Sequence, residues 1–152
     1  MRDILRRLVA GELTEDEALA ELRRVQLDEL GGRARLDLGR YLRRGIPEVV
    51  LAAGKSPADA AHLVVRMAEQ HGQGLVSRMT DAHREALADA AVDMRVIDYH
   101  LSARVLRAGF APERAEGKVA ILTAGTSDVP AADEARMVVE ACGLEARLEA
   151  DL

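Results

Sequence analysis

The clearest pattern in the chain is an unbroken apolar run that is followed by small residues and then by a helical period. Residues 119–122 are Val, Ala, Ile and Leu, which is typical of a strand covered on both faces. Small residues fill positions 123–128, and Pro130 stands where the first turn of a helix tolerates proline. The helix is expected to stop at Gly143, and the face predicted to pack on a sheet comprises Ala135, Val138, Val139 and Cys142.

A pair of amphipathic helices is predicted at the start of the chain, within residues 1–30. An apolar stripe at Ile4, Leu5 and Leu8 precedes Gly11. Thr14 and Glu17 then have the spacing of a capping box, which predicts that a second helix begins there. This pattern indicates a helical hairpin.

Residues 31–110 alternate between strand and helix patterns and predict a small α/β domain. Ser56 and Pro57 form a helix start, and Gly72 is the expected stop of that helix. Thr80 is expected to cap a further helix that runs to about residue 91. The predicted strands are residues 49–51, 75–79, 94–98 and 103–107.

The tail at residues 144–152 allows two interpretations. Apolar and charged residues alternate there with a period of two, which predicts a half-exposed edge strand. Leu144, Leu148 and Leu152 are also four apart, and the composition of the tail favours a helix.

These elements together predict an α/β protein. A helical hairpin (residues 1–30) and a small α/β domain (residues 31–110) are followed by a polar linker at residues 111–116. Residues 117–152 would then form the start of a parallel sheet.

Composition narrows the possible functions. The chain has 152 residues and a formal net charge of −5, with one Phe, two Tyr and no Trp. Both the charge and the lack of stacking rings argue against a nucleic-acid surface. Neither a signal peptide nor a membrane-spanning stretch is predicted, so the expected location is the cytoplasm. One cysteine and four scattered histidines predict neither a disulfide nor a metal site.

The candidate chemistry lies in the turn at residues 123–128. A helix that starts directly after a strand presents free backbone N–H groups and the positive end of its dipole to an anion such as phosphate. Gly125, Thr126, Ser127 and Asp128 are the candidate residues. The alternative interpretation is an ordinary turn in which Ser127 or Asp128 only caps the helix.

Two stretches of the chain resemble the LarB family. These are residues 32–56, with Gly-Ile-Pro-Glu-Val-Val at 45–50 and Gly54-Lys55, and residues 117–135, with Thr-Ala-Gly-Thr-Ser-Asp at 123–128. LarB enzymes begin the synthesis of the nickel-pincer nucleotide cofactor and carry a PurE-like carboxyl-terminal domain. The turn at 125–128 is similar to the phosphate turn of PurE. The resemblance implies that residues 117–152 begin a doubly wound, flavodoxin-like sheet of the PurE type, truncated at Leu152.

The resemblance also implies an activity. LarB enzymes carboxylate the pyridinium ring of nicotinic acid adenine dinucleotide with CO2 and hydrolyse its phosphoanhydride to release AMP, with no tightly bound cofactor. It implies a small-molecule dinucleotide as ligand, held by Gly125, Thr126, Ser127 and Asp128, and a homo-oligomer without nucleic-acid or membrane partners. Glu48 and Lys55 are further candidates.

The resemblance sets a limit on this chain as well. The nucleophilic cysteine of the family is expected beyond Leu152, so that Cys142 does not replace it and the chain alone is expected to be inactive. The alternative function is a noncatalytic nucleotide-binding or assembly module of a PurE-like protein.

Overall fold

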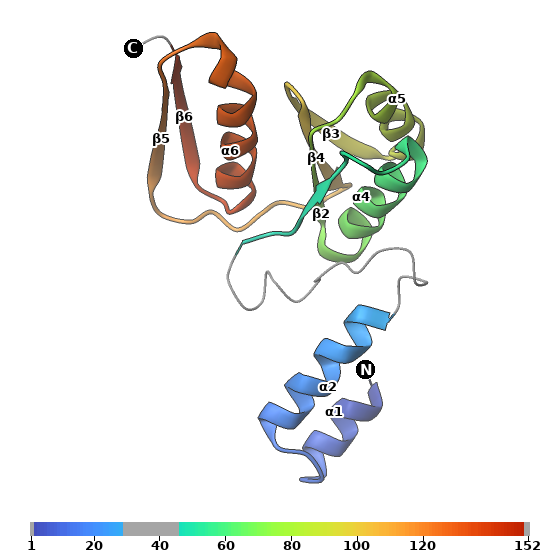
Figure 1. Ribbon diagram of the computed structural model, residues 1–152. Helices are drawn as coiled ribbons and strands as arrows, with labels where there is room; N and C mark the ends of the chain where they lie inside the picture. The colour runs from blue at the N-terminus through green and yellow to red at the C-terminus, as the bar shows by residue number, and fades with distance from the viewer. Residues whose placement is uncertain (1, 29–45, 151–152) are drawn as a thin grey trace. The chain divides into compact units, whose positions relative to one another are not determined.

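The structure is a computed structural model that describes residues 2–28 and 46–150. The chain forms two compact units, Met1–Arg44 and Gly45–Leu152. Figure 1 labels the elements of both units. The family-like stretch at residues 32–45 lies outside the described residues, whereas residues 46–56 and 117–135 are described.

The first unit contains the predicted helical hairpin, with α1 at Arg2–Val9 and α2 at Glu15–Asp28. The capping box is present: the Thr14 N–H donates to Glu17 Oε2 (2.9 Å), and the Glu17 N–H donates to Thr14 Oγ1 (3.3 Å). An Arg7–Glu21 ion pair of 2.9 Å joins the two helices. The hairpin prediction is therefore confirmed.

The second unit is a mixture of helices and strands that confirms the predicted α/β class. In chain order its elements are β1 (Val49–Leu51), α4 (Pro57–His71), β2 (Gln73–Ser77), α5 (Asp81–Ala90), β3 (Met94–Tyr99), β4 (Ser102–Arg107), β5 (Lys118–Thr123), the 3-10 turn η1 (Thr126–Asp128), α6 (Val129–Ala141) and β6 (Glu145–Ala150). The predicted strand at 75–79 is found two residues earlier, at Gln73–Ser77.

Helix α4 has the ends that its sequence predicts. The Ser56 side chain accepts from the Asp59 N–H (3.1 Å), Pro57 occupies the first turn, and Gly72 ends the helix with φ 86°. A β-carbon at Gly72 would also lie 1.9 Å from the Phe110 ring, so both backbone and packing require glycine there.

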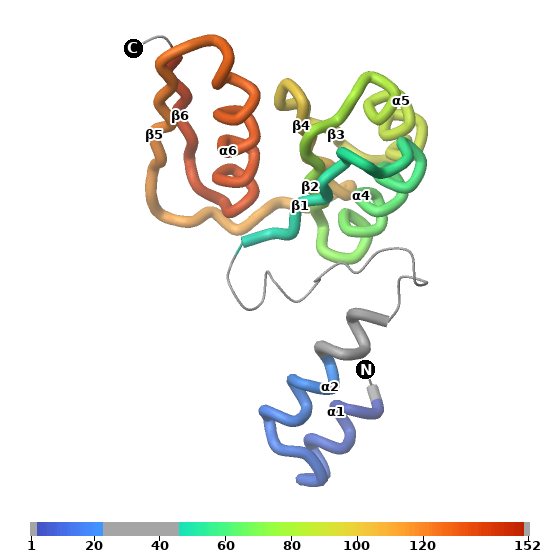
Figure 2. Tube along the Cα trace, viewed as in Figure 1, coloured from blue at the N-terminus to red at the C-terminus, as the bar shows by residue number. Residues whose placement is uncertain are grey.

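The main sheet has the strand order β1-β2-β4-β3, in which β1 and β2 are parallel and the other pairs are antiparallel. Figure 2 shows β1 beside β2. Gly74 lies against α4, because a β-carbon there would come within 2.2 Å of the Val64 carbonyl oxygen. Leu75, the next residue, points to the opposite face and contacts α6 through Met137. Helices therefore cover both faces of this sheet.

The second sheet consists of β5 and β6, which pair in parallel and are connected by α6. The strand interpretation of the tail is thus correct for Glu145–Ala150, because the ladder to β5 outweighs local helix propensity. The expectation that 119–122 is covered on both faces is wrong within the described residues. Leu122 is 62% exposed, since α6 covers only the other face.

Helix α6 lies between the two sheets and contacts strands of both (Figure 1). The predicted packing stripe is wrong in detail: Ala135 is exposed, and Val138, Val139 and Cys142 are only partly buried. A helix between two sheets buries more than one stripe, so a single-face pattern does not describe it. The buried residues of α6 are Ala132, Met137 and Ala141.

Tyr99 of β3 holds α6 through polar contacts inside this interface. Its side chain is 2% exposed, and its hydroxyl donates to Glu140 Oε2 at 2.5 Å. The Arg136 guanidinium lies 5.1 Å from the centre of the Tyr99 ring and forms an ion pair of 3.0 Å with Asp133. Tyr99 therefore contacts two α6 residues, Arg136 and Glu140, that lie about one helical turn apart.

Arg104 of β4 and Gln73 of β2 provide a second polar connection to α6. Arg104 is 5% exposed, and its Nε donates to Gln73 Oε1 at 2.9 Å. Gln73 Nε2 in turn donates to the Ala141 carbonyl oxygen at 3.0 Å, at the last turn of α6. Buried polar contacts of this kind fix the position of a helix more specifically than apolar packing does.

We predict that the Tyr99 hydroxyl makes the free energy of unfolding fall as the pH rises through the alkaline range. Burial, followed by the hydrogen bond to Glu140, raises the Tyr99 pKa to about 12, compared with about 10 in an unfolded chain. The folded state thus favours the protonated hydroxyl, and its contribution is complete below pH 10 and lost as the pH rises toward 12. Chemical denaturation at several pH values between 8 and 12 measures this loss.

Tyr99→Phe is the matched variant for that experiment. At pH 7 it should lower the free energy of unfolding by about 1–3 kcal/mol, because the Glu140 carboxylate loses a partly buried hydrogen bond. It should also remove the part of the alkaline loss that comes from Tyr99. An alkaline profile with the same steepness in both proteins would contradict the prediction.

Candidate functional site

The four turn residues Gly125, Thr126, Ser127 and Asp128 lie between the carboxyl end of β5 and the amino end of α6. The Asp128 N–H donates to the Gly125 carbonyl oxygen at 3.1 Å, and the Val129 N–H donates to that of Thr126. These bonds form the 3-10 turn η1. The backbone N–H groups of Thr126 and Ser127 make no hydrogen bond to any residue that the structure describes.

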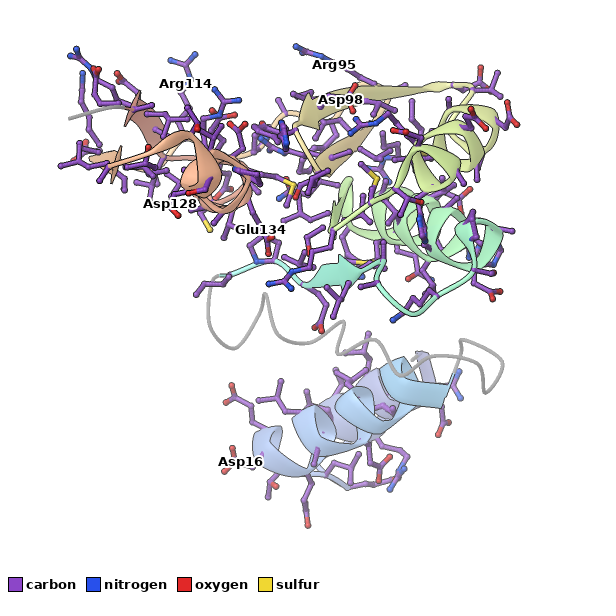
Figure 3. The ribbon with its side chains drawn as sticks, turned by 45° about the horizontal axis from the view of Figure 1, so that its top comes forward. Asp16, Arg95, Asp98, Arg114, Asp128 and Glu134 are labelled. Atoms are coloured by element: carbon purple, nitrogen blue, oxygen red, sulfur yellow. The ribbon has the colours of Figure 1, made fainter. Side chains whose placement is uncertain are left out.

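The side chains of the turn are exposed and make no polar contact with a described residue. Thr126, Ser127 and Asp128 are all exposed, and within residues 46–150 none of their side chains makes a hydrogen bond or an ion pair. Asp128 occupies the cap position of α6, but no side-chain capping bond is present. Figure 3 shows Asp128 at this end of the helix. The capping interpretation of Ser127 and Asp128 therefore finds no hydrogen bond to support it.

The electrostatics of the turn suit an anion. The aligned peptide dipoles of α6 place partial positive charge at its amino end. The first turn of α6 contains no acidic side chain, so that only Asp128 brings negative charge to the position. A phosphate could accept from the two free N–H groups and from the Ser127 hydroxyl.

Thr123 begins the 123–128 segment but is not one of the four candidate residues that the sequence analysis names. It is the last residue of β5 and is 8% exposed, and its Oγ1 has no hydrogen-bond partner among the described residues. A buried hydroxyl without a partner is uncommon in folded proteins. The available sequence signal was a hydroxyl residue at the carboxyl end of an apolar strand.

Glu48 and Lys55 lie on either side of β1, one before its amino end and one after its carboxyl end. Glu48 is partly buried. The Lys55 backbone is fixed, because its N–H donates to the Ala52 carbonyl oxygen (2.9 Å) and its own carbonyl lies 3.2 Å from His83 Nε2. The Lys55 side chain is exposed and forms no ion pair with a described residue.

Cys142 follows the last residue of α6 and is partly buried. Burial raises the pKa of its thiol, and the nearby Arg104 charge offsets this effect in part. A raised pKa reduces the thiolate fraction at neutral pH, so the environment of Cys142 does not favour nucleophilic chemistry.

The four histidines do not form a metal centre in the described part of the chain. Within residues 2–28 and 46–150, no group of three or more His, Cys, Asp or Glu side chains is placed to hold a metal ion. His83 is buried and lies 2.7 Å from the Thr80 hydroxyl, so that it serves the start of α5. Burial lowers the pKa of His71.

A hollow of about 460 Å³ lies at the other end of the β5–β6 sheet from the turn. It is lined by Arg114, Ala115, Gly117, Lys118, Gly143, Leu144 and Glu145. Lys118 is paired with Glu145 at 3.1 Å, whereas Arg114 points away from the unit in Figure 3. This hollow contains none of the predicted site residues.

Across the two described ranges, no helix has the length and apolar character that crossing a membrane requires.

Comparison with known proteins connects this fold to a family. A model of the LarB/PurE-like N-terminal domain matches residues 27–109, more than half of the chain. The match includes β1 to β4 with α4 and α5, and it ends before the turn at 125–128.

A relative in Methanocaldococcus jannaschii, an uncharacterized protein, is 30% identical over 152 residues. The similarity covers 96% of this chain and 59% of the relative, so the chain spans less than two thirds of that protein. It extends through β5, η1 and α6, which the family model does not cover. By its match over residues 27–109, the chain belongs to the LarB/PurE-like N-terminal domain family.

Proposed function

We propose that the chain supplies the amino-terminal module and the phosphate-binding turn of a LarB-type enzyme. The complete protein would carboxylate the pyridinium ring of nicotinic acid adenine dinucleotide with CO2 and hydrolyse the phosphoanhydride to release AMP. Membership of the family supports the general assignment. The specific reaction is the one implied by the resemblance of the two motif-bearing stretches.

The observation that carries the proposal is that the turn before α6 has hydrogen-bond donors without partners among the described residues. Two backbone N–H groups and the Ser127 hydroxyl have no partner among the residues that the structure describes, and they lie at the positive end of a 13-residue helix. In this proposal they bind a phosphate of the dinucleotide. The Asp128 carboxylate would repel a phosphate, so its role would be to accept from a ribose hydroxyl.

Gly125 would allow the ligand to approach the backbone closely. Its φ of −165° is accessible to every residue, and a β-carbon there would meet nothing nearer than Ser127 Oγ at 3.9 Å. Folding therefore does not require glycine at this position. Close approach of a ligand would be the reason for it.

A second candidate function is a noncatalytic nucleotide-binding or assembly module. The observation that favours it is the raised pKa of the Cys142 thiol, the one thiol in the chain. Ring activation in the proposed reaction uses a cysteine thiolate as nucleophile. If this chain acts alone, binding without turnover is the expected behaviour.

We predict that Ser127→Ala weakens binding of nicotinic acid adenine dinucleotide by about 1–3 kcal/mol, because a hydroxyl donor to a charged phosphate is lost. The Ser127 side chain makes no hydrogen bond to a described residue, so the variant should unfold at the same temperature as the original chain. Isothermal calorimetry and thermal unfolding measure the two quantities.

Glu134→Gln is the control, because Glu134 lies on the same helix and makes no described ion pair or hydrogen bond. Its affinity should equal that of the original chain. Equal affinity in Ser127→Ala as well would remove the serine from the proposed site.

We also predict that Cys142 reacts slowly with thiol reagents. Its raised pKa lowers the thiolate fraction, and partial burial restricts access. Labelling of the native chain at pH 7 should be slower than labelling in denaturant, because the folded environment of Cys142 disfavours the thiolate. Native labelling as fast as that of the unfolded chain would contradict this prediction.

A further inference from the structure

The buried hydroxyl of Thr123 has no assigned role in the proposed site. Thr123 is 92% buried, and its Oγ1 is covered from solvent and has no hydrogen-bond partner in the part of the chain that the structure describes. A covered hydroxyl that lacks a partner costs stability, because it has given up its hydrogen bonds to water. Valine has nearly the same shape and would avoid this cost.

Thr123 lies at the end of β5, where the strand leads into the turn. Side chains of β5 alternate, and the more buried set is Val119, Ile121 and Thr123. This set faces α6, which covers that side of the sheet. Thr123 is also the last residue of β5 and lies only two residues before Gly125, so the turn into α6 begins directly after it.

We infer that Thr123 is a further residue of the nucleotide site, and that its hydroxyl gains its missing hydrogen bond when a phosphate-bearing ligand occupies the turn. This inference rests on the proposed function and adds one residue to it. Two independent observations point to the segment between β5 and α6. The N–H groups of the turn have no partner among the described residues, and neither has the buried Thr123 hydroxyl.

In this proposal, ligand binding at Thr123 involves a movement of the turn that follows it. Because Oγ1 is covered from solvent, the residues after β5 would have to shift for the hydroxyl to reach a ligand. Thr126, Ser127 and Asp128 are exposed and make no side-chain bonds that would resist such a shift. The free energy that is lost by burying this hydroxyl without a partner would then be regained when it binds the ligand.

The test compares stability with affinity in the 152-residue chain. Thr123→Val should keep the unfolding temperature or raise it by a few degrees, because an unpartnered buried hydroxyl is removed. Its affinity for nicotinic acid adenine dinucleotide should fall about tenfold or more, since a hydrogen bond to a charged group is lost. Thr123→Ser, which retains the hydroxyl, should recover most of the affinity.

Thr14→Val is the matched control. The Thr14 hydroxyl is hydrogen-bonded in the capping box of α2, so the same substitution should destabilise that helix and leave the affinity unchanged. The same substitution should lower the unfolding temperature at Thr14, where a hydrogen bond is lost. It should not lower it at Thr123, where the removed hydroxyl has no partner.

Two results would overturn the inference. A clear fall in the unfolding temperature of ligand-free Thr123→Val would mean that the hydroxyl already has a partner, such as a buried water. Unchanged affinity in Thr123→Val, together with weakened affinity in Ser127→Ala, would remove Thr123 and leave the proposed function intact. If the original chain does not bind the dinucleotide, the proposed function fails first and this inference fails with it.

Discussion

The burial of α6 between two sheets is the constraint on which the second unit depends. The helix connects β5 to β6 and at the same time covers one face of the main sheet, where Leu75, Met137 and Ala141 share a core. Tyr99 and Gln73 add hydrogen bonds to Glu140 and to the last turn of the helix. Apolar burial supplies the driving force, and the polar contacts fix the rotation and position of the helix.

This fixed helix gives the turn before it a chemical role. The carboxyl half of α6 is occupied by contacts to the main sheet, whereas its amino end has free N–H groups and uncommitted side chains. The same helix therefore combines a rigid support with an open anion-binding end. Thr123, at the end of β5 just before the turn, extends this division, because its buried hydroxyl has no partner among the described residues.

Features set by local chemistry were predictable from the sequence, and features set by distant contacts were not. The capping residues Thr14 and Ser56 located helix starts, because side-chain bonds to nearby N–H groups depend on a few consecutive positions. The buried face of α6 was misassigned because it packs against strands far away in the chain. The exposure of Leu122 and the missing partner of Thr123 likewise follow from tertiary packing. The turn residues 125–128 were identifiable as candidates, and their proposed role is still to be tested.

The measurement that tests the central claim most directly is an NMR titration of the 152-residue chain with nicotinic acid adenine dinucleotide, followed at the backbone amides. The account predicts that the largest shifts fall at residues 123–129, where the free N–H groups begin α6. Smaller shifts should extend along α6 toward Glu140. Saturable shifts centred on another part of the chain, such as residues 52–56, or no shifts at all, would contradict it.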